Sequence, residues 1–158
     1  MEFVRVNHSD PVIIRRAAAV ELVDLRHAVL RVGLPRAEAM FAGDDAEASR
    51  HYGAFRGAQV LCCATLHLNE WEGRPAWQLR GMATAPHTRR QGLGRRVLAL
   101  MEQDLLAGAD VLQLWCNARV PAVDFYRDMG WQVVSDVFEI PTAGPHVRMA
   151  KRLEPDAR

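Results

Sequence analysis

The chain has 158 residues, the size of one ordinary domain, and 49% of them are hydrophobic while 25% are charged. This composition excludes a disordered, collagen-like or coiled-coil chain. Because 20 basic residues face 19 acidic ones, a strongly basic nucleic-acid-binding surface is excluded too, whereas a local cluster of cations could still bind an anionic ligand.

Membrane-spanning, signal-peptide and metal-ligand patterns do not occur in the sequence. No apolar stretch approaches the ~18 residues of a membrane span, and residues 1–10 lack the apolar segment of a signal peptide. The three cysteines, Cys62, Cys63 and Cys116, cannot all pair within one chain, and no CxxC or clustered His/Cys spacing indicates zinc. We therefore expect reduced core thiols, no bound metal, no membrane contact and a cytoplasmic location.

Strands on either side of a helical segment are predicted for the first half of the chain. A β-branched run after Pro11 is typical of a strand, and from Ala17 the apolar period becomes that of a helix, which Gly33 and Pro35 end. The expected elements are strands at Val12–Arg16, His51–Arg56, Gln59–Leu68 and Ala76–Thr84, a helix within Ala17–Val32 and a short helix at Arg36–Phe41.

The second half predicts alternating helices and strands. A long amphipathic helix opens after Gly92 and ends at Gly108, with an apolar stripe along one face. Strands at Val111–Cys116, Trp131–Glu139 and His146–Arg152, and a helix at Asn117–Met129, follow. This order predicts an α/β domain at residues 12–153 with a sheet of mixed direction, between an N-terminal extension (1–11) and a C-terminal tail (154–158).

The loop before the long helix is the most informative segment. Arg89, Arg90 and Arg95 add positive charge around Gly92 and Gly94, directly where a helix begins. Free backbone N–H groups and the positive end of the helix dipole favour a phosphate there, and glycines let it approach the backbone. The loop is neither a P-loop nor a GxGxxG dinucleotide motif. A glycine-rich turn with solvated arginines, or a nucleotide-binding protein, are the alternatives.

Two clusters together resemble the GNAT superfamily of N-acetyltransferases. The loop matches its R/Q-x-x-G-x-G/A motif at Arg89–Gly94. Asn117, Ala122, Phe125, Tyr126, Gly130 and Trp131 resemble its N-x-x-A…FY-x-x-x-G-F/W segment, with four residues instead of two between Asn117 and Ala122. The turn at Glu139–His146 is similar to a bacterial subgroup of unassigned substrate. The resemblance spans Val12–Leu153 and implies a mixed, mostly antiparallel sheet, splayed between the fourth and fifth strands and flanked by helices.

The resemblance implies acetyl transfer from acetyl-CoA to a primary amine, by direct attack in a ternary complex. The pantetheine arm would lie along the backbone of Met82, Ala83 and Thr84, and Asn117 beside the pantetheine or the acetyl group. Tyr126 would donate a proton to the departing thiolate. The pyrophosphate would be held by Arg89, Arg90, Gln91, Gly92, Leu93, Gly94 and Arg95.

Each chemical role has a structural alternative. Tyr126 could be a core aromatic residue, and Asn117 a helix N-cap. Cys116 invites a covalent acetyl-cysteine, but no base lies at an obviously coupled position, so core packing is favoured. For the general base we expect Glu139 and His146 to meet on one rim across the turn at Pro141–Pro145. The alternatives are that both stabilise the turn, or that Glu70 or Glu72 serves instead.

The amine acceptor is not specified by the sequence. By resemblance the segment Arg26–Asp45 would form an acceptor-binding lid, and its mixed charge gives no single preference between a small molecule and a peptide. The oligomeric state is open, with a homodimer among the states allowed. A non-catalytic CoA-binding sensor or scaffold module is the alternative to an enzyme, because the same loop would bind the cofactor.

Overall fold

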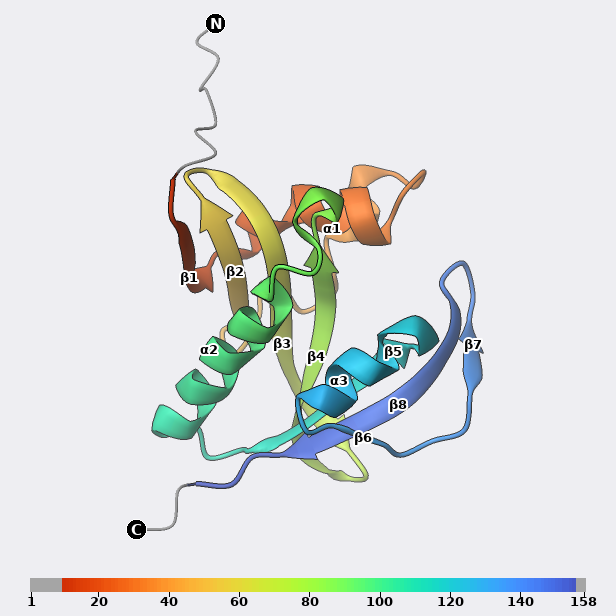
Figure 1. Ribbon diagram of the computed structural model, residues 1–158. Coiled ribbons are helices and arrows are strands. Elements are labelled where there is room, and N and C mark those ends of the chain that lie inside the picture. Colours follow the sequence, from red (N-terminus) through yellow and green to blue (C-terminus); the bar gives the residue numbers. More distant parts are fainter. Residues whose placement is uncertain (1–9, 156–158) are drawn as a thin grey trace, which may run out of the picture. The chain divides into compact units, whose positions relative to one another are not determined.

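The computed structural model describes residues 10–155 (Figure 1). The expected extension at 1–11 and tail at 154–158 lie mostly outside this range. The described residues form two compact units. The first contains the residues up to Thr65 together with Gly81–Met101, and the second contains Leu66–Arg80 together with the residues from Glu102 onward. Two strands and one helix continue from one unit into the other.

Strands in the order β1-β2-β3-β4 make the sheet of the first unit. β1 runs antiparallel to β2, with Val12 opposite Arg56 and Ala17 opposite His51. The strands are β1 (Val12–Ala17), β2 (Arg50–Arg56), the first part of β3 (Gln59–Trp71) and the last part of β4 (Arg74–Thr84). The short helices are η1 (Ala19–Leu22), α1 (Val23–Leu30), η2 (Arg36–Ala39) and η3 (Pro86–Thr88).

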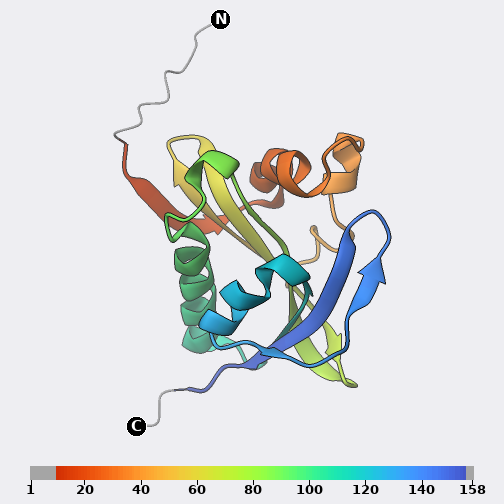
Figure 2. The same ribbon diagram turned by 45° about the vertical axis from the view of Figure 1, so that its right-hand side comes forward.

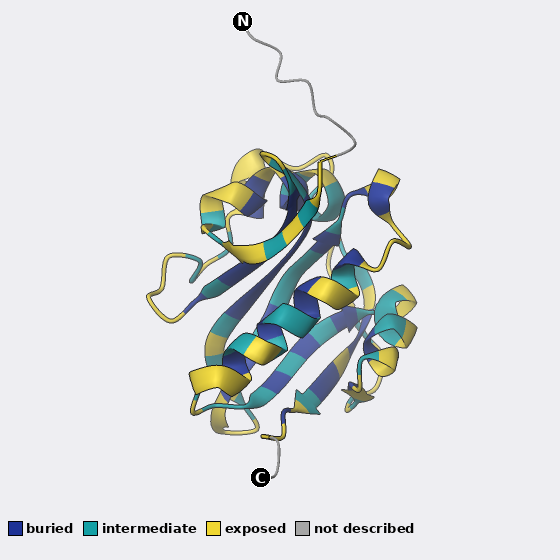
Figure 3. Ribbon diagram, turned by 60° about the vertical axis from the view of Figure 1, so that its left-hand side comes forward, coloured by how far each residue is buried: buried dark blue, intermediate teal, exposed yellow. Residues whose placement is uncertain are grey.

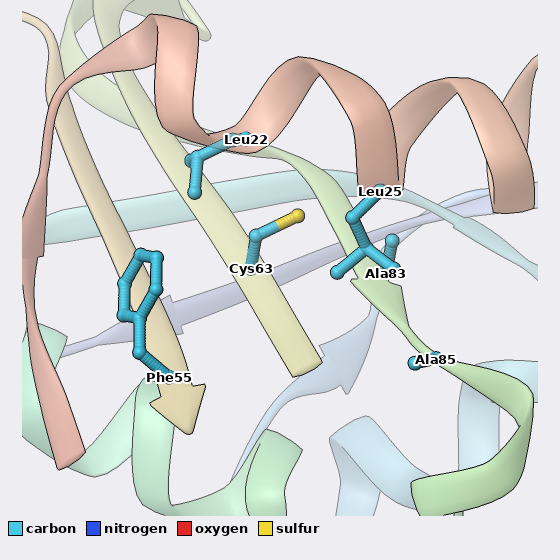
Figure 4. Packing of buried hydrophobic residues seen from close by; sticks show 6 residues of the cluster. All are labelled: Leu22, Leu25, Phe55, Cys63, Ala83 and Ala85. Atoms are coloured by element: carbon cyan, nitrogen blue, oxygen red, sulfur yellow. The ribbon is translucent and has the colours of Figure 1, made fainter. Parts of the chain in front are cut away.

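The core of the first unit lies between α1 and the sheet (Figure 4). Leu22 and Leu25 point from the helical segment toward Cys63 of β3 and Ala83 of β4. Every residue of Leu61–Leu66 is buried, so this part of β3 is covered on both faces. A strand covered on both faces has an apolar run in its sequence, as β3 does at Val60–Ala64.

The second unit holds a sheet in the order β3-β4-β5-β8-β6, with β7 also paired to β8 (Figure 2). β4 pairs with β5 in parallel, with Trp77–Leu79 opposite Leu114–Cys116, while β8 is antiparallel to its neighbours. The mixed, mostly antiparallel sheet flanked by helices is thus confirmed. The elements are β5 (Gln113–Arg119), η4 (Val120–Ala122), α3 (Val123–Asp128), β6 (Gln132–Val133), β7 (Phe138–Ile140) and β8 (Gly144–Arg152).

The long helix α2 (Leu93–Gly108) has the predicted apolar stripe. Buried and exposed residues alternate along it (Figure 3). The buried residues are Leu93, Val97, Leu98, Met101 and Leu105. Their spacing of three and four residues places them on one side of the helix. Among the described residues, no helix is both long and apolar enough to cross a membrane.

The predicted strand at Trp131–Glu139 is wrong, because two short strands, β6 and β7, replace it. Between them the Ser135 hydroxyl accepts a hydrogen bond from the Arg148 backbone N–H at 2.7 Å. A side chain therefore occupies the place of the backbone acceptor that would continue the ladder. The chain leaves β8 at this point and returns at Phe138, opposite His146.

Two other boundaries also differ from the prediction. The hairpin of β3 and β4 extends farther than expected, because Glu72 and Gly73 alone form its turn, with φ of 53° and 76°. Two positive φ angles match the twist of the paired strands, so the polar residues beside them remain in strands. The helix expected at Asn117–Met129 begins later, since β5 continues to Arg119 along β8.

Candidate functional site

The last residues of β4 follow a local distortion at Gly81. Its φ is +64°, and a Cβ atom there would lie 3.0 Å from both Arg26 Nε and Phe41 Cε2, so the position requires glycine. Past this point Ala83 is buried in the core of the first unit, while Met82 and Thr84 are partly exposed. The backbone expected to lie along a pantetheine arm is therefore part of a firmly packed strand.

The parallel pairing of β4 with β5 covers only Trp77–Leu79. Met82, Ala83 and Thr84 are not part of this register, which ends at Leu79 of β4. A strand edge with free N–H and C=O groups can pair with an extended ligand, as it does with another strand. The predicted use of the backbone of Met82, Ala83 and Thr84 by a pantetheine arm stays a prediction.

The loop from η3 into α2 presents backbone donors and unpaired cations in the first unit. Arg90 has a φ of +65° and Gly92 of +75°, and the first backbone bond of the helix runs from Arg96 N–H to Gly92 O at 3.1 Å. The amides of residues 93–95 precede that bond, so the helix does not use them. Within residues 10–155 no ion pair neutralises Arg89, Arg90 or Arg95.

Tyr126 of α3 is 6% exposed in the second unit. Its ring packs edge-to-face against Phe125 and Trp131, with centroids 5.2 and 5.5 Å apart. These contacts fix the ring as they would fix a core aromatic residue, and the catalytic role stays a prediction. Both uses are compatible, because a proton donor also has to be held in one orientation.

The two faces of the sheet in the second unit differ in what covers them. Lys151 shares a face with Met149 and Cys116, and its Nζ donates to Met129 O at 2.6 Å and to Glu102 at 2.7 Å. Met129 directly follows α3, so this helix covers that face. Asn117 lies on the opposite face, because it pairs with Arg148.

Asn117 is a strand residue and not a helix N-cap, so the N-cap alternative is wrong. It belongs to β5, and the N-cap positions of η4 and α3 are Arg119 and Ala122. The Asn117 Oδ1 atom is buried and accepts no hydrogen bond from any described residue. A buried acceptor without a donor is costly in a folded protein, so this atom suits a ligand N–H group.

Glu139 and His146 do lie in neighbouring antiparallel strands, but not on one face. The register sets His146 opposite Phe138 and Glu139 opposite Pro145, so their side chains point to opposite sides of the β7–β8 pair. The expected meeting of the two on one rim is therefore wrong. Glu139 is exposed, whereas His146 is buried and stacks with Phe138 at a centroid distance of 6.2 Å.

His146 has a defined tautomer in this position. Its Nδ1 lies 2.7 Å from Gly144 O. Because a carbonyl oxygen only accepts, Nδ1 carries the proton in this bond, and the neutral ring keeps the lone pair on Nε2. His146 can therefore accept a proton without Glu139, since Gly144 O orients the ring.

The cysteine thiols are not in a state suited to nucleophilic attack. All three are free and buried, and burial raises the pKa of Cys63 and of Cys116 to about 12 and raises that of Cys62 as well. A thiol needs a lowered pKa or a nearby base to react as a thiolate at neutral pH. Among the described residues, no group of three or more His, Cys, Asp or Glu side chains could hold a metal ion.

A buried polar network in the first unit was missed in the sequence. Arg26 is fully buried, donates to Asp44 at 2.6 and 3.3 Å and to Thr65 Oγ1 at 2.6 Å, and lies 4.2 Å from the Phe41 ring centroid. It thereby ties together the two ends of the segment expected to form a lid. An arginine in a short helix gives no sign of burial, because its partners lie 18 and 39 residues away.

Comparison with known proteins assigns the family. The model of the acetyltransferase (GNAT) family matches residues 21–131, well over half of the chain. The chain belongs to the GNAT acetyltransferase family. This GNAT chain is 30% identical over 146 residues to the uncharacterized N-acetyltransferase YitI of Bacillus subtilis, a match that covers 89% of this chain and 95% of the relative.

Solved structures share the fold of this GNAT acetyltransferase. Escherichia coli ElaA has a TM-score of 0.74 and 17% identity, over 90% of this chain and all of that one. An aminoglycoside 6′-N-acetyltransferase complexed with coenzyme A has a TM-score of 0.72 and 15% identity, over 92% of this chain and 99% of that one. The predicted GNAT fold and acetyltransferase class are confirmed, and the family uses acetyl-CoA.

Proposed function

We propose that this enzyme transfers an acetyl group from acetyl-CoA to a primary amine, by direct attack within a ternary complex. The observation that carries the proposal is the loop at Arg89–Arg95, where unneutralised arginines and glycine precede the free amides of a 16-residue helix. This arrangement suits the pyrophosphate of the cofactor that the family uses. Gly92 also leaves open space, because no atom beyond its chain neighbours lies within 4 Å of the position of a Cβ there.

Two further parts of the protein would contact the pantetheine arm and the acetyl group of the cofactor. The backbone of Met82, Ala83 and Thr84 would hydrogen-bond the amides of the pantetheine arm, because this length of β4 lies beyond its pairing with β5. Asn117 would lie beside the pantetheine or the acetyl group, with its unpartnered Oδ1 atom available to an N–H group. Gln91 and Leu93 would bind the pyrophosphate through their backbone N–H groups.

The transfer forms one bond and breaks one. The neutral amine nitrogen attacks the acetyl carbon, the new C–N bond forms and the C–S bond breaks. The CoA thiolate then takes a proton from a donor, and we assign this role to the Tyr126 hydroxyl. The attacking amine gives up its proton to a base. A tyrosine suits the first role, because an unperturbed phenol has a pKa of ~10 and stays protonated at neutral pH.

For the base we propose His146 alone, acting directly or through water. The hydrogen bond from Nδ1 to Gly144 O leaves the Nε2 lone pair available. Glu139 is left without this role, because it lies on the other side of the hairpin. Direct attack needs no acetyl-cysteine, and the high pKa of Cys116 supports that route. Free buried thiols also suit a reducing compartment, so we propose a cytoplasmic location.

The test measures cofactor binding and turnover separately. Calorimetry should show one acetyl-CoA per chain, and a panel of amino acids, polyamines, aminoglycosides and peptides should reveal CoA release with at least one amine. His146→Ala should slow that release at pH 7, by a factor that shrinks as the pH nears the pKa of the amine. Binding without release from any amine would favour a CoA-binding module, and absence of binding would refute the proposal.

A further inference from the structure

One face of the sheet in the second unit carries arginines and aromatic rings, and the described strands β4, β5, β7 and β8 place no carboxylate on it. It is the face opposite α3, and the register places Asn117 opposite Arg148, Arg119 opposite His146 and Phe138 opposite His146. We call this surface the arginine face; its central side chains are Trp115, Asn117, Arg119, Phe138, His146 and Arg148.

Arg148 is a fixed and unpaired cation at the centre of the arginine face. Its Cζ lies 5.2 Å from the Trp115 ring centroid and 5.9 Å from that of Phe138. Arg148 is exposed, and no carboxylate in the described part of the chain pairs with it. A guanidinium held over aromatic rings keeps its in-plane N–H groups free, and these match the two oxygens of a carboxylate.

The aromatic support of Arg148 is itself held in place by hydrogen bonds. Trp115 Nε1 donates to Asn69 Oδ1 at 3.0 Å, and Asn69 Nδ2 donates to Gln78 Oε1 at 2.8 Å. This chain of bonds joins three strands and fixes the indole ring beneath the guanidinium.

Two further groups near Arg148, an amide oxygen and an imidazole nitrogen, are available to a ligand. Asn117 Oδ1 is buried without a donor, and Asn117 is the direct cross-strand partner of Arg148. His146 lies two residues before Arg148 on the same face, with Nε2 free to accept a proton. Directly opposed residues have Cβ atoms about 4.5–5.5 Å apart, and neighbours on one strand face about 7 Å. All three groups could therefore contact one small molecule.

We infer that the acceptor of this enzyme is a small amine that also carries a carboxylate. The inference rests on the proposed function and names its substrate class. Arg148 would bind the carboxylate, Asn117 Oδ1 would accept an N–H of the amine, and His146 would take the proton that the amine loses. Because the described strands place no acid on the arginine face, this face would repel polycationic acceptors such as polyamines and aminoglycosides.

The experiment compares acceptors in matched pairs. Each amino carboxylate, such as glycine, alanine, leucine or phenylalanine, is assayed beside its carboxamide. The carboxamide has the less basic amine, so a larger fraction of it is neutral at pH 7. Amine basicity alone would therefore give the carboxamide the higher kcat/KM. We expect kcat/KM to be at least about 10-fold higher for the carboxylate of the preferred pair, on the scale of a hydrogen bond to a charged group.

Arg148→Met tests whether the preference comes from this side chain. We expect the variant to lose about 10- to 100-fold in kcat/KM for the carboxylate, to keep its activity toward the carboxamide within threefold, and to bind acetyl-CoA like the parent. Arg148→Lys should restore part of the preference. Arg152→Met is the matched control, because Arg152 is exposed on the same strand face without an aromatic contact and should keep the preference.

The failures of the two proposals are distinguishable. Turnover of amines without a carboxylate preference, or an equal effect of Arg148→Met on both members of a pair, overturns the inference and leaves the acetyltransferase function standing. Preference for a phosphorylated amine over the carboxylates also overturns it. Failure to bind acetyl-CoA at all refutes the proposed function, and the inference falls with it.

Discussion

At the scale of single residues, the packing of Tyr126 does not distinguish a proton donor from a core aromatic residue. The side chain is buried against Phe125 and Trp131, which suits both a core aromatic residue and an oriented proton donor. A substitution that removes the Tyr126 hydroxyl and keeps the ring distinguishes a catalytic role from a purely structural one. Tyr52, which is fully buried in β2, is the other tyrosine of the chain and offers a matched comparison.

Tyr126→Phe should lower kcat by about 10- to 1,000-fold, because the thiolate loses its proton donor. The affinity for acetyl-CoA should change little, since the ring and its packing remain. Steady-state kinetics with calorimetry measures both quantities. Tyr52→Phe should leave kcat within about twofold. Equal kcat for the parent and Tyr126→Phe, where chemistry limits the rate, would return Tyr126 to a purely structural role.

At the residue scale, the arrangement of a segment could be predicted where its motif is local in sequence and not where a partner is distant. The glycine and arginine positions at Arg89–Gly94 adjoin the helix that they serve, so their arrangement could be anticipated. The side of the sheet on which Asn117 lies depends instead on its pairing with a strand about 30 residues away. That of His146 depends on its pairing with a strand about 8 residues away. Gly81 looked like an ordinary strand residue, since its contact with Arg26 spans 55 positions.

At the scale of elements, α2 was predictable and the segment after α3 was not. The helix has five buried residues at regular spacing, and its start and end are marked by glycines. The segment from Trp131 to Glu139 is rich in residues typical of strands and is interrupted at Ser135 and Asp136, where Ser135 Oγ accepts a hydrogen bond from the Arg148 N–H. A side chain that replaces a ladder acceptor leaves no periodic signal in the sequence.

The start of α2 yields a test of the cofactor loop. Gly94→Glu should weaken acetyl-CoA binding by about 10- to 100-fold, because a carboxylate beside the free amides repels the pyrophosphate and competes for its donors. The helix itself should tolerate the change, since a negative charge in the first turn is favourable. Calorimetry measures the affinity, and circular dichroism the helix content.

Gly108→Glu is the matched control for that substitution. Gly108 lies at the other end of α2, and no atom beyond its chain neighbours and the backbone of the helix lies within 4 Å of the position of a Cβ there. The same charge at this end should leave the affinity for acetyl-CoA within about threefold. If both variants bound acetyl-CoA as tightly as the parent, the pyrophosphate would not lie on this loop.

At the scale of the whole molecule, the Arg26 network joins several elements of the first unit through buried polar contacts. Arg26 binds Asp44 and Thr65, His51 lies 2.8 Å from Thr65 Oγ1, and His51 Nε2 lies 3.0 Å from Asp44 O. These contacts link α1, the segment after η2 and two strands. Such a network specifies one arrangement of these elements, and removing the Asp44 charge leaves the buried Arg26 guanidinium without this carboxylate.

Asp44 makes the stability of the protein depend on pH in acid. Burial alone would raise its pKa, but hydrogen bonds from Arg26 and from the Phe41 N–H outweigh that effect, so the folded-state pKa lies below the usual value. A depressed pKa adds stability above the unfolded-state value of ~3.9, and this contribution is lost as the pH falls through the folded-state pKa. Acid below about pH 4 should therefore weaken the fold progressively.

Asp44→Asn should remove that contribution and leave Arg26 as an uncompensated buried charge. We expect the free energy of unfolding at pH 7 to fall by about 3–5 kcal/mol, and its dependence on pH between about 5 and 2 to become shallower than that of the parent. Urea denaturation across this range measures both effects. Asp24→Asn is the control, because the Asp24–Arg36 pair is 83% and 51% exposed and should contribute less than about 1 kcal/mol. Equal losses in the two variants, or an unchanged acid dependence in Asp44→Asn, would show that the buried pair does not govern acid stability.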